Sequence, residues 1–522
     1  MQKIEAIKKL ATGLSLCVLA TSLYAANSVS NTVTHASYAT VTEALAALSE
    51  DGQTLIVAPG VYTESELVIT YAVTLRGMDA ATTVIQPSAT PGSASTRVAS
   101  VNIPAEWNVT LPVVFEQLTL RHGNTSGNGG ALYVQEGSLQ VLNCIVSNNA
   151  AGSGGGLFCM SGADASLTVE DTLIKGNTAT SQGGGGVRGA FLRCTFGNNR
   201  AANGGGAAYA SLDGCDIENN AAADQGGGLY QGSATRCTIR NNVACFGGGA
   251  FGSALANALL SKNSASQNGG GLYQGAATNC TLVVNAASTA GGGLWGSTAV
   301  NSILYGNQAP AGADYTNAAA LAYCCASPLP PGIGNTNTYP RFRDIDSGDY
   351  SLLSYSPCVN AGNSAATPPG TDLSGNARTQ SARVDMGAYE HDPAVVDYLG
   401  FEQWLQRHGI AIDPANQFTQ DQDGDGIPNG LAFAFGANRI DGAFLSIRHT
   451  PEGAVAETAP QQPESIGYVD LNVETTDLMS DAAVWTNAQP VATGAPPNAY
   501  RFRCNAPNAS KQGFFRLKAK LP

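Results

Sequence analysis

An acidic loop near residue 425 carries the clearest pattern for binding chemistry in this chain. The Ile427 carbonyl would add a ligand to its alternating oxygens, which are typical of a calcium loop closed by a tight glycine turn. Ala432 stands where a full loop has its bidentate carboxylate. We therefore expect a weakened, structural calcium site, with a solvated acidic turn as the alternative. The side chains of the pattern are Asp421, Asp423, Asp425, Gly426 and Asn429.

Six aromatic residues follow glycine clusters at one matching position. Alternation along a strand puts them opposite inward leucines, so we expect the rings to point outward. A column of exposed rings would suit sugar rings or a partner protein. In the alternative interpretation, the rings shield the glycine turns and stiffen the coils. The residues are Tyr133, Phe158, Tyr230, Phe251, Tyr273 and Trp295.

The sequence assigns no catalytic residue. Sugar hydrolysis needs two carboxylates on one face, and Lys262 is the only charged residue between Ala244 and Ala313. We interpret the scattered acids and arginines of earlier coils as a solvated edge. An exposed cleft between about 100 and 240, lined by at least two acids and an arginine, would favour an enzyme instead. These residues are Glu170, Asp171, Asp213, Asp216, Glu218, Asp224, Arg188, Arg193 and Arg236.

Seven glycine triplets organise the middle of the chain. From the last glycine of one triplet to the last glycine of the next, the distances are 30, 20, 22, 21, 22 and 22 residues. This spacing is typical of a solenoid. Glycine triplets and alternating short apolar runs exclude helical repeats. The triplets end at Gly156, Gly186, Gly206, Gly228, Gly249, Gly271 and Gly293.

Fixed positions within each repeat predict the inside of the coil. A small residue (Cys194, Cys215, Cys237, Ala258, Cys280, Ser302) stands two positions before a large apolar one (Phe196, Ile217, Ile239, Leu260, Leu282, Leu304). A turn asparagine follows, able to adopt a left-handed backbone and to bond the same amide one coil on (Asn177, Asn199, Asn220, Asn242, Asn263, Asn285, Asn307). We predict an all-β fold: a right-handed parallel β-helix with three short strands per coil.

Changes in composition and hydrophobic pattern along the chain suggest its domains. We expect a signal peptide at 1–25, the β-helix at 26–320 with a capping helix at 42–48, and its modified end at 321–395. A helix, the calcium loop and a second helix would occupy 396–437, and a small β-sandwich 438–522. Beyond the leader we find no apolar run long enough to span a membrane.

Composition restricts the partners that we expect and the cellular compartment in which the protein acts. A formal charge of −13 argues against nucleic acid as a partner. Export permits disulfides, yet most of the eleven cysteines beyond the leader fit as small buried thiols. Three lie outside the repeat by our assignment and would be free to pair: Cys324, Cys325 and Cys358.

Three stretches resemble known families. The triplets with Leu229-Tyr230 or Leu294-Trp295 resemble polymorphic outer-membrane protein repeats, and 53–62 is similar to the first coil of pectin-lyase-like folds. Residues 356–363, 371–376 and 384–390 resemble the choice-of-anchor Q domain, and the tail from about 398 is similar to modules of secreted Verrucomicrobia proteins. These resemblances imply a bacterial surface protein, without one fixed reaction.

The combined expectation is a secreted or cell-surface β-helix scaffold or adhesin. It would bind extracellular polysaccharide or a surface protein along its flank. The alternative is a divergent polysaccharide lyase or glycoside hydrolase.

Overall fold

Short strands stack from coil to coil, each in parallel with its counterpart in the next coil. A representative coil contains β26 (Leu229–Tyr230), β27 (Ser233–Thr235), β28 (Thr238–Arg240) and β29 (Val243–Phe246). Leu229 lies opposite Ala250, so one coil here takes 21 residues. The sequence predicted three strands per coil. The fourth, β29, forms because the segment after the turn asparagine also aligns with its neighbours.

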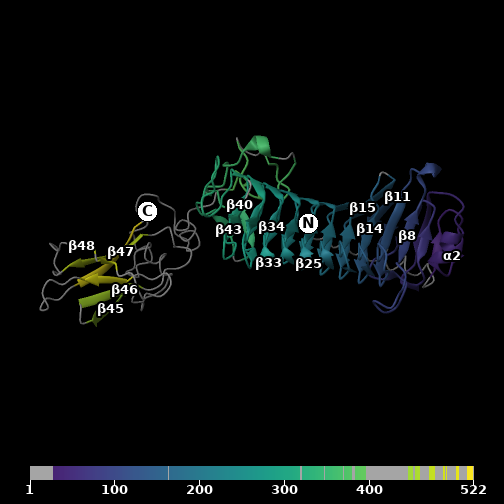
Figure 1. Ribbon diagram of the computed structural model, residues 1–522, viewed down its shortest axis with the longest axis horizontal. Helices are drawn as coiled ribbons and strands as arrows, with labels where there is room; N and C mark the ends of the chain where they lie inside the picture. The colour runs from purple at the N-terminus through teal and green to yellow at the C-terminus, as the bar shows by residue number, and fades with distance from the viewer. Residues whose placement is uncertain are drawn as a thin grey trace, which may run out of the picture. The chain divides into compact units, whose positions relative to one another are not determined.

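The computed structural model describes residues 28–395, except 163, 318–319, 346, 355, 368–369 and 379–382, together with seven strands between 445 and 520. The chain divides into two units, Met1–Ala394 and Val395–Pro522. The first unit is dominated by the predicted parallel β-helix (Figure 1).

Four rows of strands make the faces of the β-helix. Face 1 contains β5 (Leu67–Ile69), β8 (Ala99–Asn102), the start of β11 (Leu132–Leu142), β14 (Leu157–Cys159), β18 (Gly186–Val187), β22 (Ala207–Ala208), β26, β30 (Ala250–Phe251), β34 (Leu272–Tyr273), β38 (Leu294–Trp295) and β41 (Tyr315–Thr316). Face 2 contains β3 (Gln53–Val57), β6 (Val73–Gly77), β9 (Val113–Glu116), the end of β11, β15 (Ala165–Glu170), β19 (Ala190–Leu192), β23 (Ser211–Asp213), β27, β31 (Ala254–Ala256), β35 (Ala276–Thr278), β39 (Thr298–Val300) and β42 (Ala320–Ala322).

The other two faces complete each coil. Face 3 contains β4 (Gly60–Thr63), β7 (Thr83–Gln86), β10 (Thr119–Arg121), β12 (Ile145–Ser147), β16 (Leu173–Lys175), β20 (Thr195–Gly197), β24 (Asp216–Glu218), β28, β32 (Leu259–Ser261), β36 (Thr281–Val283) and β40 (Ile303–Tyr305). Face 4 contains β13 (Ala150–Ala151), β17 (Thr178–Ala179), β21 (Arg200–Asn203), β25 (Ala221–Gln225), β29, β33 (Ser264–Asn268) and β37 (Ala286–Ala287).

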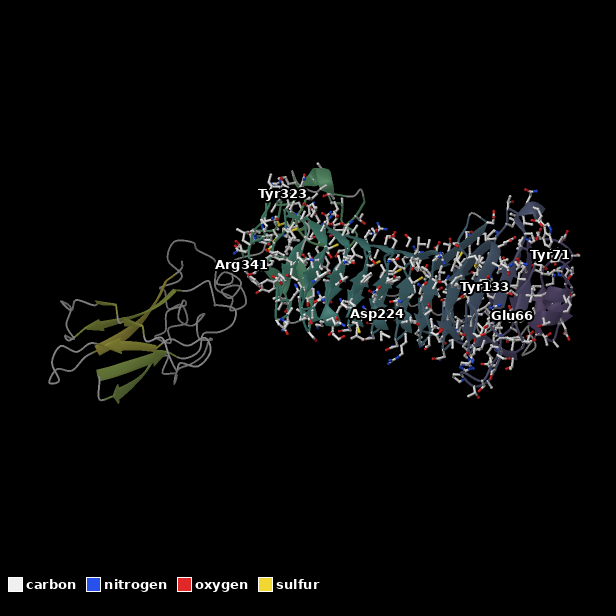
Figure 2. All side chains as sticks on the ribbon, viewed as in Figure 1. Glu66, Tyr71, Tyr133, Asp224, Tyr323 and Arg341 are labelled. Carbon is white, nitrogen blue, oxygen red and sulfur yellow. The ribbon has the colours of Figure 1, made fainter. Side chains whose placement is uncertain are left out.

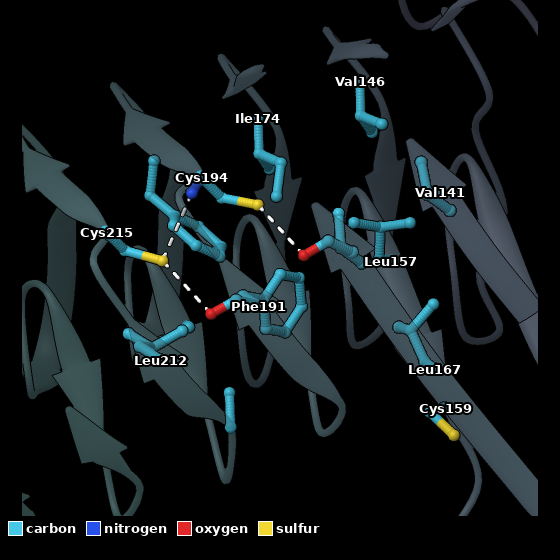
Figure 3. Packing of buried hydrophobic residues seen from close by; sticks show 14 of the residues in the cluster. Val141, Val146, Leu157, Cys159, Leu167, Ile174, Phe191, Cys194, Leu212 and Cys215 are labelled. Atoms are coloured by element: carbon cyan, nitrogen blue, oxygen red, sulfur yellow. Dashed lines mark hydrogen bonds between the residues drawn. The ribbon is translucent and has the colours of Figure 1, made fainter. Parts of the chain in front are cut away.

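The predicted inward positions are buried. Cys194 and Cys215 point into the interior beside Phe191 and Ile174 (Figure 3). The assignment of Cys324 was wrong: β42 pairs with β39 in register, so Cys324 lies one coil beyond Ser302 and continues the small-residue position. A 22-residue step from Ser302, past the last glycine triplet, would have found it.

The turn asparagines form the predicted ladder. Asn220 Nδ2 donates to Asn242 Oδ1 at 3.0 Å, and Asn242 Nδ2 donates to Asn263 Oδ1 at 3.0 Å. The ladder starts one coil earlier than expected, at Asn149, and ends where Asn307 Nδ2 donates to the carboxylate of Asp314.

The left-handed backbone was assigned to the wrong residue of this turn. The residue before the ladder asparagine takes the positive φ, as at Asn219 (φ 56°) and Asn241 (φ 54°). The ladder asparagine itself must keep its amide pointing inward to reach its neighbours.

Helix α2 (Val41–Ala46) stands at the start of the β-helix, slightly shorter than predicted. Thr40 caps it by accepting a hydrogen bond from the Glu43 backbone N–H at 3.1 Å. The Glu64 carboxylate accepts from the backbone N–H groups of Val41 and Thr42, which complements the positive end of the helix. Strands β1 (Val29–Asn31) and β2 (Ser37–Tyr38) pair beside β3.

The remaining elements lie at the loops and the chain end. The first unit also has the 3-10 turns η1 (Ala105–Trp107) and η2 (Ser364–Ala366), and the hairpin of β43 (Phe342–Asp344) and β44 (Asp349–Leu352). The second unit contains one antiparallel sheet of β45 (Leu445–Thr450), β46 (Gly453–Thr458), β50 (Arg501–Cys504) and β49 (Gln489–Pro490). A second sheet contains β48 (Thr486–Asn487), β47 (Asp470–Thr476) and β51 (Phe514–Lys520). Their packing as a sandwich stays a prediction.

Replacing Gly227 by alanine tests the close approach of the coils at the glycine triplets. A Cβ there would lie 2.6 Å from the Val243 carbonyl oxygen and closer still to that of Gly248, both backbone atoms. We expect Gly227→Ala to destabilise the β-helix by about 3 kcal/mol or more. Gly197→Ala is the control, because a Cβ at Gly197 meets nothing within 4 Å. Equal thermal midpoints for the two variants would contradict the stacking.

Asn242→Ala tests the ladder. The change leaves the Ile217 carbonyl and the Asn220 backbone and side-chain N–H groups without their buried partner. We expect a loss of about 2–4 kcal/mol in the free energy of unfolding. Asn241→Gly, at the adjacent left-handed position, should be nearly neutral. Chemical denaturation measures both.

Candidate functional site: a flank cleft and an aromatic stack

A cleft of about 570 Å³ lies on the β-helix where face 2 turns into face 3. Its floor comes from the turn after β23, with Asp213 and Asp216 on either side of Cys215, and from Arg193 and Arg236 of the neighbouring coils. Parallel stacking brings Thr195, Asp216 and Thr238 side by side, since β20, β24 and β28 pair in register.

The opposite wall comes from a distant part of the chain, residues 356–390, which we call the folded-back segment. Thr371, Leu373, Ser374 and Tyr389 line the cleft from this side. The Thr371 hydroxyl accepts a hydrogen bond from Arg236 Nη1 at 3.2 Å. The sequence offered no signal for this wall, because 135 residues separate the two partners.

Buried hydrogen bonds hold the folded-back segment in place. The Asp372 carboxylate is inaccessible to solvent and accepts from the backbone N–H groups of Asn376 at 2.6 Å and Glu390 at 2.8 Å. Ala388 N–H donates to the Thr281 hydroxyl at 2.9 Å, which ties the segment to β36. The wall is therefore built into the fold.

Most of the scattered acids and arginines pair with one another across coils, whereas Arg188 lies over the rings of Phe158 and Tyr209 and no ion pair of Asp216 or Asp224 is found within the described residues. Arg236 makes a two-pronged contact with Asp213, at 3.0 and 2.5 Å. Arg193 Nη2 lies 2.9 Å from both Glu170 and Asp171, and Arg240 lies 2.7 Å from Glu218. Hydrogen bonding to Arg193 lowers the pKa of Asp171. The expected solvated edge is thus a set of exposed ion pairs, each weak in water.

A second charged group lies within the folded-back segment. Arg378 Nη1 and Glu390 Oε2 are 3.2 Å apart, and both side chains are 2% exposed. Burial, reinforced by the nearby Asp385 carboxylate and opposed by Arg378, raises the pKa of Glu390 to about 8. Burial also raises the pKa of Asp385. The segment therefore holds more carboxyl groups than its one buried arginine neutralises.

The aromatic residues do form a column on face 1, in register from coil to coil. Tyr273 and Trp295 stack with ring centres 4.4 Å apart and planes 3° apart, and Phe251 and Tyr273 stack at 5.0 Å and 12°. Stacked rings cover each other's faces and leave mainly their edges to solvent. Phe158 keeps the outward register position of Tyr133, but it is only 7% exposed, because Arg188 lies over its ring at 5.9 Å; the prediction that this ring is accessible was wrong.

One aromatic ring beside this column, Tyr209, was missed. Val187 and Ala208 occupy the register position in two coils, and Tyr209 fills the gap by packing edge-on against Tyr230 at 5.5 Å. Arg97 lies over Tyr133, which Figure 2 labels, at 4.9 Å. Tyr209 comes one position later after its triplet than the other rings, which hid it from a fixed-spacing search.

The geometry of the described residues does not favour thiol or metal chemistry. The ten cysteines between 144 and 358 are free, and burial raises the pKa of Cys144 to about 12 and of Cys280 to about 11. No three His, Cys, Asp or Glu side chains within the described residues come together as a metal-ligand set. The predicted calcium loop, its ligands at 421–429 and its flanking helices lie outside the described residues. No helix in the described part is long and apolar enough for a membrane crossing.

Fold and repeat define the class as parallel β-helix proteins. The family described as periplasmic copper-binding protein (NosD) matches residues 170–309. A search of curated proteins gives no match. A crystal structure of pectate lyase Pel9A is similar at 12% identity over 67% of this chain and 91% of that chain, with a TM-score of 0.38. Pectin methylesterase from Yersinia enterocolitica is similar at 14% identity over 50% and 79%, with a TM-score of 0.24.

The buried carboxyl of Glu390 predicts a pH dependence of stability. Its raised pKa means that the folded chain retains a proton that the unfolded chain releases near pH 4.5. Stability should fall as pH rises between about 5 and 8, by up to about 1.4 kcal/mol per pH unit, and then level off. Glu390→Gln should reduce this slope, to which the raised pKa of Asp385 also contributes, whereas Glu218→Gln, in an exposed ion pair, should keep it. Thermal midpoints from pH 5 to 9 measure the difference, and parallel profiles for all three proteins would contradict the assignment.

Proposed function

We propose that this chain is an exported, non-catalytic β-helix scaffold of adhesin type that binds extracellular polysaccharide or a surface protein through its flank. A solenoid presents a long, rigid lateral surface, which suits binding more than enclosed chemistry. The flank cleft adds to that surface a hollow lined by several polar groups, as ligand sites are.

The observation that carries this proposal is the pairing of Asp213. Both of its oxygens accept hydrogen bonds from Arg236. A general acid or base must be able to exchange a proton with the substrate. A carboxylate held in a two-pronged ion pair is poorly suited to that exchange, and Asp216 alone does not make the pair that hydrolysis requires.

A specific observation favours the alternative, a divergent polysaccharide lyase or glycoside hydrolase. The cleft contains two carboxylates and two arginines within the region where we expected an active site to lie. Substrate binding that displaced Arg236 from Asp213 would free the second carboxylate.

A glycan array with parallel assays of product release separates the two functions. We expect the mature protein to bind and to release nothing from either acidic or neutral polysaccharides. Release of reducing ends or unsaturated oligosaccharides that disappears in both Asp213→Asn and Asp216→Asn would establish the enzyme instead.

Export, the capping role of α2 and calcium remain parts of the proposal that rest on sequence. Residues 1–25 support export, and the oxygen ligands Asp421, Asp423, Asp425 and Asn429 with the Ile427 carbonyl support a structural calcium site. Within the described residues the ladder thiols are buried and hydrogen-bonded to backbone carbonyls, so they do not support binding of the copper named for the matching family.

A further inference from the structure

Some polar groups of the flank cleft already make hydrogen bonds or ion pairs within the protein, and others do not. Arg236 uses Nε and Nη2 on Asp213 and Nη1 on Thr371. Arg193 uses Nε and Nη2 on Asp171 and Glu170. Each arginine is therefore balanced by carboxylate before any ligand arrives.

The groups left for a ligand are mostly hydroxyls. Asp216 is exposed, and no hydrogen bond or ion pair to its side-chain carboxylate is found in the described part of the chain. Thr238, Ser374 and Tyr389 line the same space, and within the described residues no hydrogen bond of their hydroxyls is found. Burial raises the pKa of Tyr389 to about 12, so its hydroxyl stays protonated and able to donate near neutral pH.

The charge around the cleft disfavours an anionic ligand. The accessible lining carboxylates, Asp213 and Asp216, equal Arg193 and Arg236 in number, since the Asp372 carboxylate is buried and bonded within the folded-back segment. Glu170 and Asp171 add two more beside Arg193. A uronic acid would bring its own carboxylate to a site without an unpaired cation, which costs affinity through desolvation and repulsion.

We infer that the flank cleft binds a neutral, hydroxyl-rich sugar unit of a polysaccharide, an inference that rests on the proposed binding function. Asp216 accepts from sugar hydroxyls, the side chains of Thr238, Ser374 and Tyr389 complete the hydrogen bonds, and the Tyr389 ring with Leu373 gives an apolar side. The volume of about 570 Å³ is in the range of sites for small ligands. The folded-back segment is therefore half of the binding site.

Equilibrium binding of the full mature chain to a neutral β-glucan, a neutral xylan and polygalacturonate, at fixed ionic strength, tests this inference. We expect binding to at least one neutral polymer and at least about tenfold weaker binding to polygalacturonate. Asp216→Ala should weaken neutral binding about tenfold or more, as the loss of a charged acceptor does. Ser374→Trp should block the cleft. Both positions are exposed, so the variants should fold, and circular dichroism checks this.

Two further variants distinguish binding in the flank cleft from binding elsewhere on the β-helix. Ser266→Trp, at an exposed position on β33, should bind like the parent chain. Trp295→Ala examines the aromatic stack as a rival site. Neutral-glycan binding that survives Ser374→Trp but fails in Trp295→Ala, or a preference for polygalacturonate, would overturn the inference and leave the proposed function standing. Binding to no glycan and to no surface protein would overturn the proposed function as well.

Discussion

Close contact between successive coils is the constraint on which this structure depends. At the glycine triplets one backbone lies directly against the next, and a Cβ on Gly227 or Gly248 would meet a carbonyl oxygen of the neighbouring coil. On the other side of the turn, ladder asparagines bond across the same gap, as between Asn220 and Asn242 at 3.0 Å. Backbone pairing, asparagine amides and ring stacking all require one coil spacing, so each reinforces the others.

The repeat made much of this predictable. Cys215 and Ile217 could be assigned inward because two-residue spacing fixes the face of a strand, and both are buried. Sequence spacing failed where the repeat ended or shifted. Cys324 follows no glycine triplet, and Tyr209 lies one position later after its triplet than the other rings of the column do. The left-handed residue of the turn was also misassigned, since composition alone does not distinguish Asn219 from Asn220.

The cleft was harder to foresee, for a different physical reason. Asp213, Asp216 and Arg236 were recognised as candidates, and their stacking follows from the 21- to 22-residue repeat. Thr371 and Tyr389 reach the cleft through a buried network, including Asp372 and Glu390, that has no periodicity to reveal it. The resulting surface unites a regular side and an irregular one. Variation in the irregular side would change the cleft while leaving the coils intact.

The end of the asparagine ladder also bears on how long such a molecule can grow. An amide both donates and accepts, so a row of asparagines has no internal reason to stop. Asp314 accepts from Asn307 Nδ2 with one carboxyl oxygen and from the Ser327 backbone N–H with the other, so it has no amide group to continue the row. Asp314 is not the next asparagine position of the repeat: it lies 7 residues after Asn307, just before Tyr315, which pairs with Leu294, and from there it ends the row. It gives the row a direction and leaves no amide there on which a second molecule could continue it into a fibre.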